Sequence, residues 1–389
     1  MPPKKKKAKN SGKSISPSDK PKDSKSPIQQ NDSLFLKLPV EILTTQILDY
    51  FPNVPVGIPE EIRPDHSQGP APLLPEIVLE RSKVLRALAQ TCRRLREVCL
   101  PLQWEQLDLC AYPHERGYGG SWYLTITKKT ERVSEGLLNS PDLASYVRII
   151  NVALTRCSPK TVLPAFARCI QALPNLHTLQ VVHAHTQITS FIKNGFEGFS
   201  FPQIRTVIIP PQAHNLLLSC PEVRRVVCDC WVDSQKLVAP IVKICKKVER
   251  LEGMEMTMTT LKRLVKSASN LKYLDLQLDR IDEYYFCNPE RINVLVGFKQ
   301  LTELNMKSRE ADVNESLTNH KDVIQAAKKL LAKLPTHKER VLKLSSGMEV
   351  EPYRWDYKRG SRYGSLKSLQ REDPRPRWVK VIDIGNDVQ

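Results

Sequence analysis

The chain has 389 residues, of which 41% are hydrophobic, and a formal net charge of +17. This length is enough for two domains with cores of their own. No apolar run approaches the length of a membrane span, and no hydrophobic segment follows the lysine-rich start, so we expect no membrane partner and a location in the nucleus, the cytoplasm or both.

Residues 1–33 are rich in Lys, Ser, Pro and Asp and have almost no apolar side chains. Such a segment cannot offset the entropy of ordering, so we expect a disordered basic tail. The lysine block Lys4, Lys5, Lys6 and Lys7 could serve as a nuclear-import signal. The alternative is a basic tail that only keeps the chain soluble.

Residues 34–103 are predicted to form a small helical domain. Apolar side chains between Leu36 and Phe51 repeat with a period of 3.6 residues, and a second stripe runs from Val84 to Val98. We expect one helix over 84–99, with Pro101 marking its end. The Pro- and Gly-rich stretch between the stripes predicts an inserted loop over 52–83.

Downstream, three apolar positions with the spacing U-x-x-U-x-U recur at intervals of roughly 19 to 30 residues, where U is an apolar residue. These copies begin at Val147, Leu176, Ile204, Val223, Val248, Leu271 and Leu301, and an earlier triplet with the same internal spacing begins at Trp104. Each triplet ends in the alternation of a strand buried on one face, and amphipathic helical patterns lie between several copies, as at 162–173 and 237–245. The copy at Val248 is irregular, because Gly253 occupies its third position.

A strand and a helix in each unit predict an α/β fold in which stacked units share one core. We expect a leucine-rich-repeat-like solenoid over 104–345, with the helix at 323–331 covering its open end. A basic, aromatic extension occupies 346–389. An ordinary α/β domain is the alternative, although it leaves the spacing unexplained.

The helical region resembles an F-box. The motif Leu38-Pro-Val-Glu41-Ile42-Leu43 is followed by Ile47-Leu48 and then by Leu88-Ala-Gln-Thr-Cys92-Arg-Arg-Leu95-Arg. The continuation from Val98 to Trp104 is similar to F-boxes of large fungal families. F-boxes usually join these helices by a short turn, and they usually carry Trp at the position of Leu95.

The resemblance implies that the chain is a substrate-receptor subunit of a Skp–cullin–F-box ubiquitin ligase. Its partners would be the Skp-type adaptor with the cullin complex and a protein substrate of unknown identity. The adaptor-binding residues that it implies are Leu38, Pro39, Ile42, Leu43, Ile47 and Leu88. These side chains could equally pack the first helix against the second.

The substrate would bind the concave, helix-free face of the sheet, where alternation places the residues between the buried positions. The candidate substrate-binding residues are Gln180, Arg225, Arg250, Glu252, Tyr273, Asp275 and Asn305. Asn151, Ile208, Val227, Thr178 and Glu303 share this face. We expect most of these side chains to be solvated.

Neither catalysis nor a cofactor is expected. The glycines Gly117, Gly119 and Gly120 lack the lysine and the helix start of a phosphate-binding loop, and no metalloprotease or nucleophile-turn motif occurs. The pairs Cys228-x-Cys230 and His183-x-His185 have no second pair at zinc-finger spacing, so no metal site is predicted. The alternative function is a nuclear scaffold that binds nucleic acid through its basic tails, including the cations and aromatics at 353–363, and whose F-box is degenerate.

Overall fold

The structure is a computed structural model that describes residues 37–50, 76–110, 122–228, 234–278, 287–308, 310, 312–334, 339–346, 379–382 and 384. Contacts between backbone positions divide the chain into Met1–Pro39 and Val40–Gln389. The first unit is described only from Lys37 to Pro39. The second contains all the secondary structure discussed below.

The described part of the second unit begins with the helices α2 (Val40–Tyr50), α3 (Glu76–Thr91) and α4 (Arg93–Glu105). The predicted helix over 84–99 is therefore two helices, and α3 begins inside the predicted loop 52–83. The break falls at Cys92, whose backbone is extended and whose Sγ accepts a hydrogen bond from the backbone N of Leu95, capping α4. The predicted end at Pro101 is also wrong. Proline removes only one helical hydrogen bond, and α4 continues past it.

Among the described residues, a ten-stranded sheet follows, with its strands in the order of the chain. They are β1 (Gln106–Leu109), β2 (Ile149–Leu154), β3 (Thr178–Ala184), β4 (Thr206–Ile209), β5 (Arg225–Cys228), β6 (Arg250–Glu252), β7 (Tyr273–Gln277), β8 (Glu303–Ser308), β9 (Val341–Ser346) and β10 (Val379–Ile382). Neighbouring strands from β1 to β9 are parallel, whereas β10 is antiparallel to β9. The chain thus has the predicted α/β class.

All eight predicted strands are present, as β1 to β8. Each begins two residues after the first apolar position of its triplet, and the middle positions pair across the sheet in one row. This row consists of Leu107, Ile150, Leu179, Val207, Val226, Leu251, Leu274, Leu304 and Leu342. The carbonyl of the residue before a strand also accepts two hydrogen bonds from the next strand–helix repeat. The carbonyl of Arg148, for example, accepts from the backbone N atoms of His177 and Thr178.

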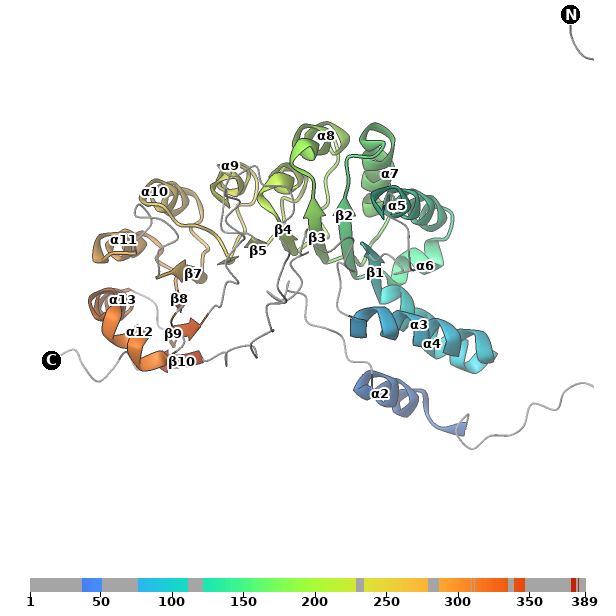
Figure 1. Ribbon diagram of the computed structural model, residues 1–389, viewed down its shortest axis with the longest axis horizontal. Helices are drawn as coiled ribbons and strands as arrows, with labels where there is room; N and C mark the ends of the chain where they lie inside the picture. The colour runs from blue at the N-terminus through green and yellow to red at the C-terminus, as the bar shows by residue number, and fades with distance from the viewer. Residues whose placement is uncertain are drawn as a thin grey trace, which may run out of the picture. The chain divides into compact units, whose positions relative to one another are not determined.

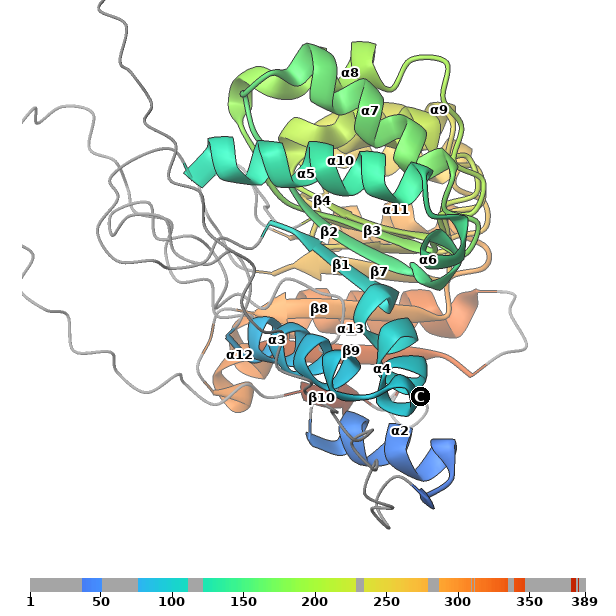
Figure 2. The ribbon, with the colours of Figure 1, turned by 90° about the vertical axis from the view of Figure 1, so that its right-hand side faces the viewer.

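Most of the remaining helices lie along one face of this sheet (Figures 1 and 2). They include α5 (Trp122–Leu138), α7 (Pro159–Gln171), α8 (Thr189–Gly195), α9 (Val238–Lys243), α10 (Met258–Ser267), α11 (Pro289–Val294) and α13 (Lys321–Lys333). The helices predicted around 162–173, 237–245 and 323–331 correspond to α7, α9 and α13. α13 does not cover an open edge at β8, because β9 pairs there.

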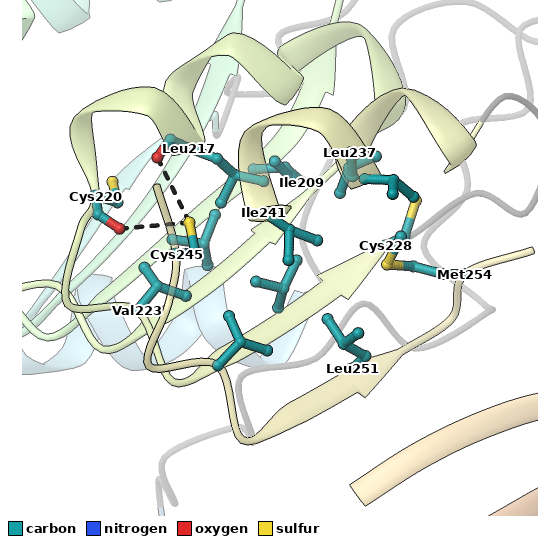
Figure 3. Close-up of a cluster of buried hydrophobic side chains, with 14 of the residues drawn as sticks. Ile209, Leu217, Cys220, Val223, Cys228, Leu237, Ile241, Cys245, Leu251 and Met254 are labelled. Atoms are coloured by element: carbon teal, nitrogen blue, oxygen red, sulfur yellow. Dashed lines mark hydrogen bonds between the residues drawn. The ribbon is translucent and has the colours of Figure 1, made fainter. Parts of the chain in front are cut away.

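The core between helices and sheet is continuous from Leu107 to Ile382. Figure 3 shows its middle part, where Ile209, Ile241 and Leu251 pack together. The Cys245 thiol lies in this cluster and donates to the backbone oxygens of Leu217 and Cys220, both at 3.6 Å. Because side chains alternate along a strand, the residues between these buried positions lie on the opposite, helix-free face of the sheet.

Candidate functional site

The helix-free face carries the residues that alternate with the buried row. Asp108, Asn151, Gln180, Ile208, Val227 and Glu252 pair in succession from β1 to β6, and Asp275, Asn305 and Lys343 pair from β7 to β9. A second row on this face includes Arg225, Arg250, Tyr273 and Glu303. The predicted alternation is therefore correct, and it brings six of the seven candidate substrate-binding residues onto adjacent strands.

Several of these side chains are not solvated, contrary to the prediction. Asn151, Gln180, Asp275 and Asn305 are buried, and Asp275 is only 1% exposed. A buried polar group needs hydrogen-bond partners, and Asn151, Asp275 and Asn305 each have at least one on a neighbouring strand. Burial was missed because alternation assigns a side chain to a face and says nothing about how closely its neighbours pack.

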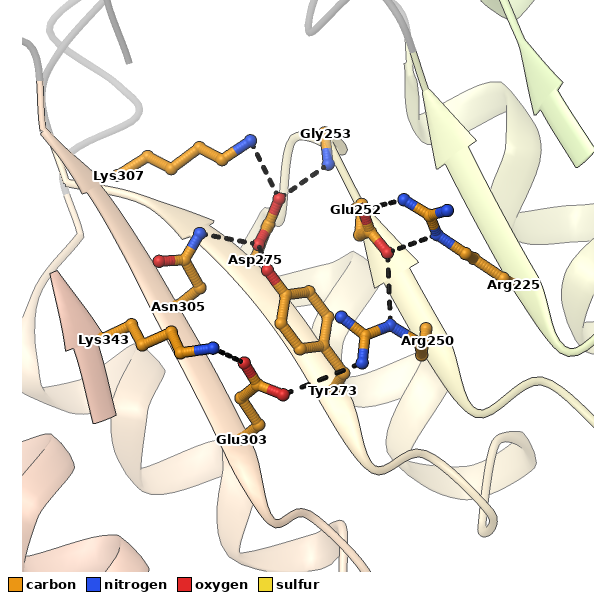
Figure 4. A network of polar contacts seen from close by, with 10 residues as sticks. All are labelled: Arg225, Arg250, Glu252, Gly253, Tyr273, Asp275, Glu303, Asn305, Lys307 and Lys343. Atoms are coloured by element: carbon orange, nitrogen blue, oxygen red, sulfur yellow. Dashed lines mark hydrogen bonds and ion pairs between the residues drawn. The ribbon is translucent and has the colours of Figure 1, made fainter. Parts of the chain in front are cut away.

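Asp275 is the hub of a polar cluster on β7 and β8. Its carboxylate accepts hydrogen bonds from the Tyr273 hydroxyl at 2.5 Å, from Nδ2 of Asn305 at 3.0 Å and from the backbone N of Gly253 at 3.4 Å. Nζ of Lys307 lies 2.9 Å from the same carboxylate (Figure 4). Burial and then the Asp275 charge raise the pKa of Tyr273, so the phenol stays protonated and remains a donor.

A second cluster joins β5 to β9 through alternating charges. The Arg225 guanidinium binds the Glu252 carboxylate through two hydrogen bonds of 2.7 and 2.8 Å. Arg250 contacts Glu252 at 3.3 Å and Glu303 at 3.7 Å, and Lys343 contacts Glu303 at 2.5 Å. The guanidinium carbon of Arg250 also lies 3.9 Å from the centre of the Tyr273 ring, a cation–π geometry.

The pKa of Glu252 shows which effect dominates there. Burial raises the pKa of this carboxyl, but the hydrogen bonds and charges of Arg225 and Arg250 outweigh burial and hold it below its usual value. Glu252 in turn raises the pKa of Arg225. Both groups are therefore charged at neutral pH.

The two clusters form one paired surface, which we call the β5–β9 network. It contains the cations Arg225, Arg250, Lys307 and Lys343 and the carboxylates Glu252, Asp275 and Glu303. The carboxylates are 2% to 21% exposed, whereas the cations keep 30% to 43% of their side-chain surface exposed. A ligand would therefore meet mainly the basic groups.

Sequence reasoning missed Lys307 and Lys343 as members of this network. Lys343 lies on β9, a strand that carries no complete triplet. Lys307 follows the third apolar position of its triplet, whereas the candidate residues all lie between the apolar positions of theirs. Conversely, the candidate Gln180 lies on β3, two strands from Arg225 in the sheet.

A smaller polar cluster lies at the β1 end. The Asp108 carboxylate accepts from Nδ2 of Asn151 at 2.8 Å and from Nε2 of Gln106 at 3.0 Å, while Nζ of Lys129 donates to the Asp108 backbone oxygen at 2.7 Å. Burial is the largest influence on the Asp108 carboxyl and raises its pKa despite these contacts. The cluster thus consists of short-range contacts that fix β1, β2 and α5.

The implied adaptor-binding residues divide into two groups. Leu43 is completely buried and Ile47 is 8% exposed, so these two pack inward, where α2 contacts α4. Ile42 is 47% exposed, and Leu88 on α3 is half-buried. In the first unit, Leu38 is half-buried and Pro39 exposed. Only the outward members can meet a partner without unpacking a helix.

Other predicted features lie outside the described residues. These are the basic tail with Lys4 to Lys7, Cys230, the glycines at 117–120 and the aromatic, basic stretch at 353–363. Within the described ranges, no three His, Cys, Asp or Glu side chains are grouped so that they could hold a metal ion. No helix in those ranges combines the length and apolar character that crossing a membrane requires.

Comparison with known proteins does not assign the chain to a family. No protein-family model matches the chain, and no curated protein matches it closely enough to count as a relative. Function must therefore be inferred from the chain's own residues and geometry.

Proposed function

We propose that this chain is the substrate-receptor subunit of a Skp–cullin–F-box ubiquitin ligase, with an F-box over α2 to α4 and a leucine-rich-repeat-like solenoid over β1 to β9. The chain would have no catalytic role. It would hold a protein substrate near the ligase.

The observation that carries the proposal is the division of apolar residues on α2. Leu43 and Ile47 are buried, while Val40 and Ile42 are each 47% exposed. An 11-residue helix that buries one apolar pair and exposes another has more apolar surface than its own packing uses. The exposed pair lies in the part of the sequence that resembles the adaptor-binding segment of F-boxes.

The solenoid part of the proposal rests on the regularity of the sheet. Each unit contributes one strand, the strands follow chain order, and the middle apolar positions form one row. The spacing of the units is close to that of leucine-rich repeats. On this basis the β5–β9 network is the proposed substrate surface, where Arg250 and Lys343 would attract acidic segments.

Adaptor binding provides the test. We expect full-length wild type to capture purified Skp-type adaptor at about 150 mM and about 500 mM salt, because an apolar helix interface is little affected by screening. Ile42→Glu places a charge in that interface and should weaken capture about tenfold or more. Val296→Glu is the matched control, since Val296 is 58% exposed but lies beyond α11.

Two results would contradict the proposal. One is that the wild-type protein does not capture the adaptor, although its cooperative unfolding in urea shows that it is folded. The other is equal capture by Ile42→Glu and wild type. If the wild type instead binds nucleic acid with an affinity that falls steeply between about 50 and about 200 mM salt, the alternative of a basic nuclear scaffold is favoured.

A further inference from the structure

Strand β10 forms one edge of the sheet. In the strand order it has β9 on one side and, among the described residues, no strand on the other (Figure 1). At the opposite edge, β1 continues directly from α4 and also contacts α5. An edge strand presents backbone N–H and C=O groups that can pair with another chain.

The side chains of β10 differ sharply between its two faces. Ile382 is 8% exposed and belongs to the core beneath the helices. Val379 and Val381 are 67% and 62% exposed, and they pair with Ser345 and Lys343 on the helix-free face. Ile382 therefore anchors the strand, while the two valines are available to side chains of an added strand.

Lys380 argues against a second copy of this chain as the occupant. In an antiparallel pair, residues directly opposite each other share a face. The register that sets Val379 opposite the second copy's Val381 also sets Lys380 opposite the second copy's Lys380. Like charges directly opposite destabilise a pair, and lysine on an edge strand is a known means of preventing self-association.

The same geometry selects a different occupant. We propose that the β10 edge binds an extended peptide segment of a partner protein in which an acidic residue stands between two apolar residues. The backbone of that segment would add an eleventh strand, its apolar side chains would cover Val379 and Val381, and its carboxylate would face Lys380. This inference does not depend on the ligase proposal, because it uses neither α2 nor the β5–β9 network.

A charge exchange tests the proposal on the full-length protein. The probes are two fluorescein-labelled peptides, Ser-Thr-Val-Glu-Val-Thr-Ser and the same sequence with Lys in place of Glu, and the readout is fluorescence anisotropy. Wild type should bind the Glu peptide about fivefold more tightly than the Lys peptide. Lys380→Glu should reverse that preference. Lys333→Glu, an equal change of charge at an exposed position on α13, should keep the wild-type preference.

A third peptide separates strand addition from simple charge attraction. Methylation of the backbone nitrogens of the Glu peptide removes the N–H donors that a strand needs, so its binding should be lost. Binding that survives methylation, or equal changes in Lys380→Glu and Lys333→Glu, would overturn the proposal. It would also be overturned if folded wild type binds neither peptide, or if sedimentation shows a wild-type dimer that Val381→Lys dissociates.

Discussion

Gly253 follows β6 with a φ of +66°, and a Cβ atom built on it would lie 2.1 Å from the carbonyl oxygen of Cys228. Its backbone N also donates to Asp275. The glycine that made the Val248 triplet irregular is therefore required by the close approach of two neighbouring strands. The sequence marked the position as unusual, but only the register explains why.

Replacing Gly253 by alanine should lower the free energy of unfolding by about 2 to 4 kcal/mol, because it adds a clash with backbone to the cost of a positive φ. Gly198→Ala is the control, since Gly198 has a φ of +80° and nothing within 4 Å of the built Cβ. That variant should lose only about 1 kcal/mol. Urea unfolding of both variants measures the difference, and equal losses would show that the clash with Cys228 relaxes.

At the scale of elements, the sequence predicted most of the strands but missed β9 and the boundary between α3 and α4. β1 to β8 were found because each has apolar residues at the first two positions of its triplet and, except at Gly253, at the third, whereas β9 was missed because Glu339 occupies the first position of its triplet. The break at Cys92 was missed because the apolar stripe continues across it. The site was found in part, because alternation gives the face of a side chain but the contacts of Lys307 and Lys343 depend on cross-strand register.

The ion pair between Arg225 on β5 and Glu252 on β6 predicts that the stability of the folded chain depends on pH. The pKa of Glu252 is lower in the folded chain than the value of about 4.3 expected when unfolded. Its contribution is therefore complete above about pH 4.3 and is lost as the pH falls through the folded pKa. Glu252→Gln should cost about 1 kcal/mol at neutral pH, a value reduced by the partial exposure of Arg225, and its deficit should shrink toward about pH 3.

Urea midpoints of wild type and Glu252→Gln from about pH 3 to about pH 7 provide the measurement. Glu222→Gln is the control, because Glu222 also pairs with Arg205 and Lys247 but at the protein surface, and its substitution should have the smaller effect. A deficit for Glu252→Gln that is constant across this range would mean that its ion pairs contribute nothing to folding.

At the scale of the whole molecule, one core joins the strand–helix units. The buried cluster extends from Leu107 to Ile382, and the free thiols Cys169, Cys220, Cys245 and Cys287 lie within it. Burial raises the pKa of Cys169 and Cys287 to about 11 and that of Cys245 to about 12. Because the thiolate is the reactive form, these cysteines should be inert in the native chain.

Pulse labelling with iodoacetamide near pH 8 should therefore modify Cys92 and Cys157, which are half-buried, before the four core thiols. In increasing urea the core thiols should become reactive over the same range in which far-UV circular dichroism is lost, because they share one continuous core. Tryptic peptides separate these six positions, whereas Cys228 shares its peptide with Cys230 and is left out. Labelling of Cys220 and Cys245 at lower urea than Cys169 would instead show that the middle units open on their own, as stacked units held only by their neighbours can.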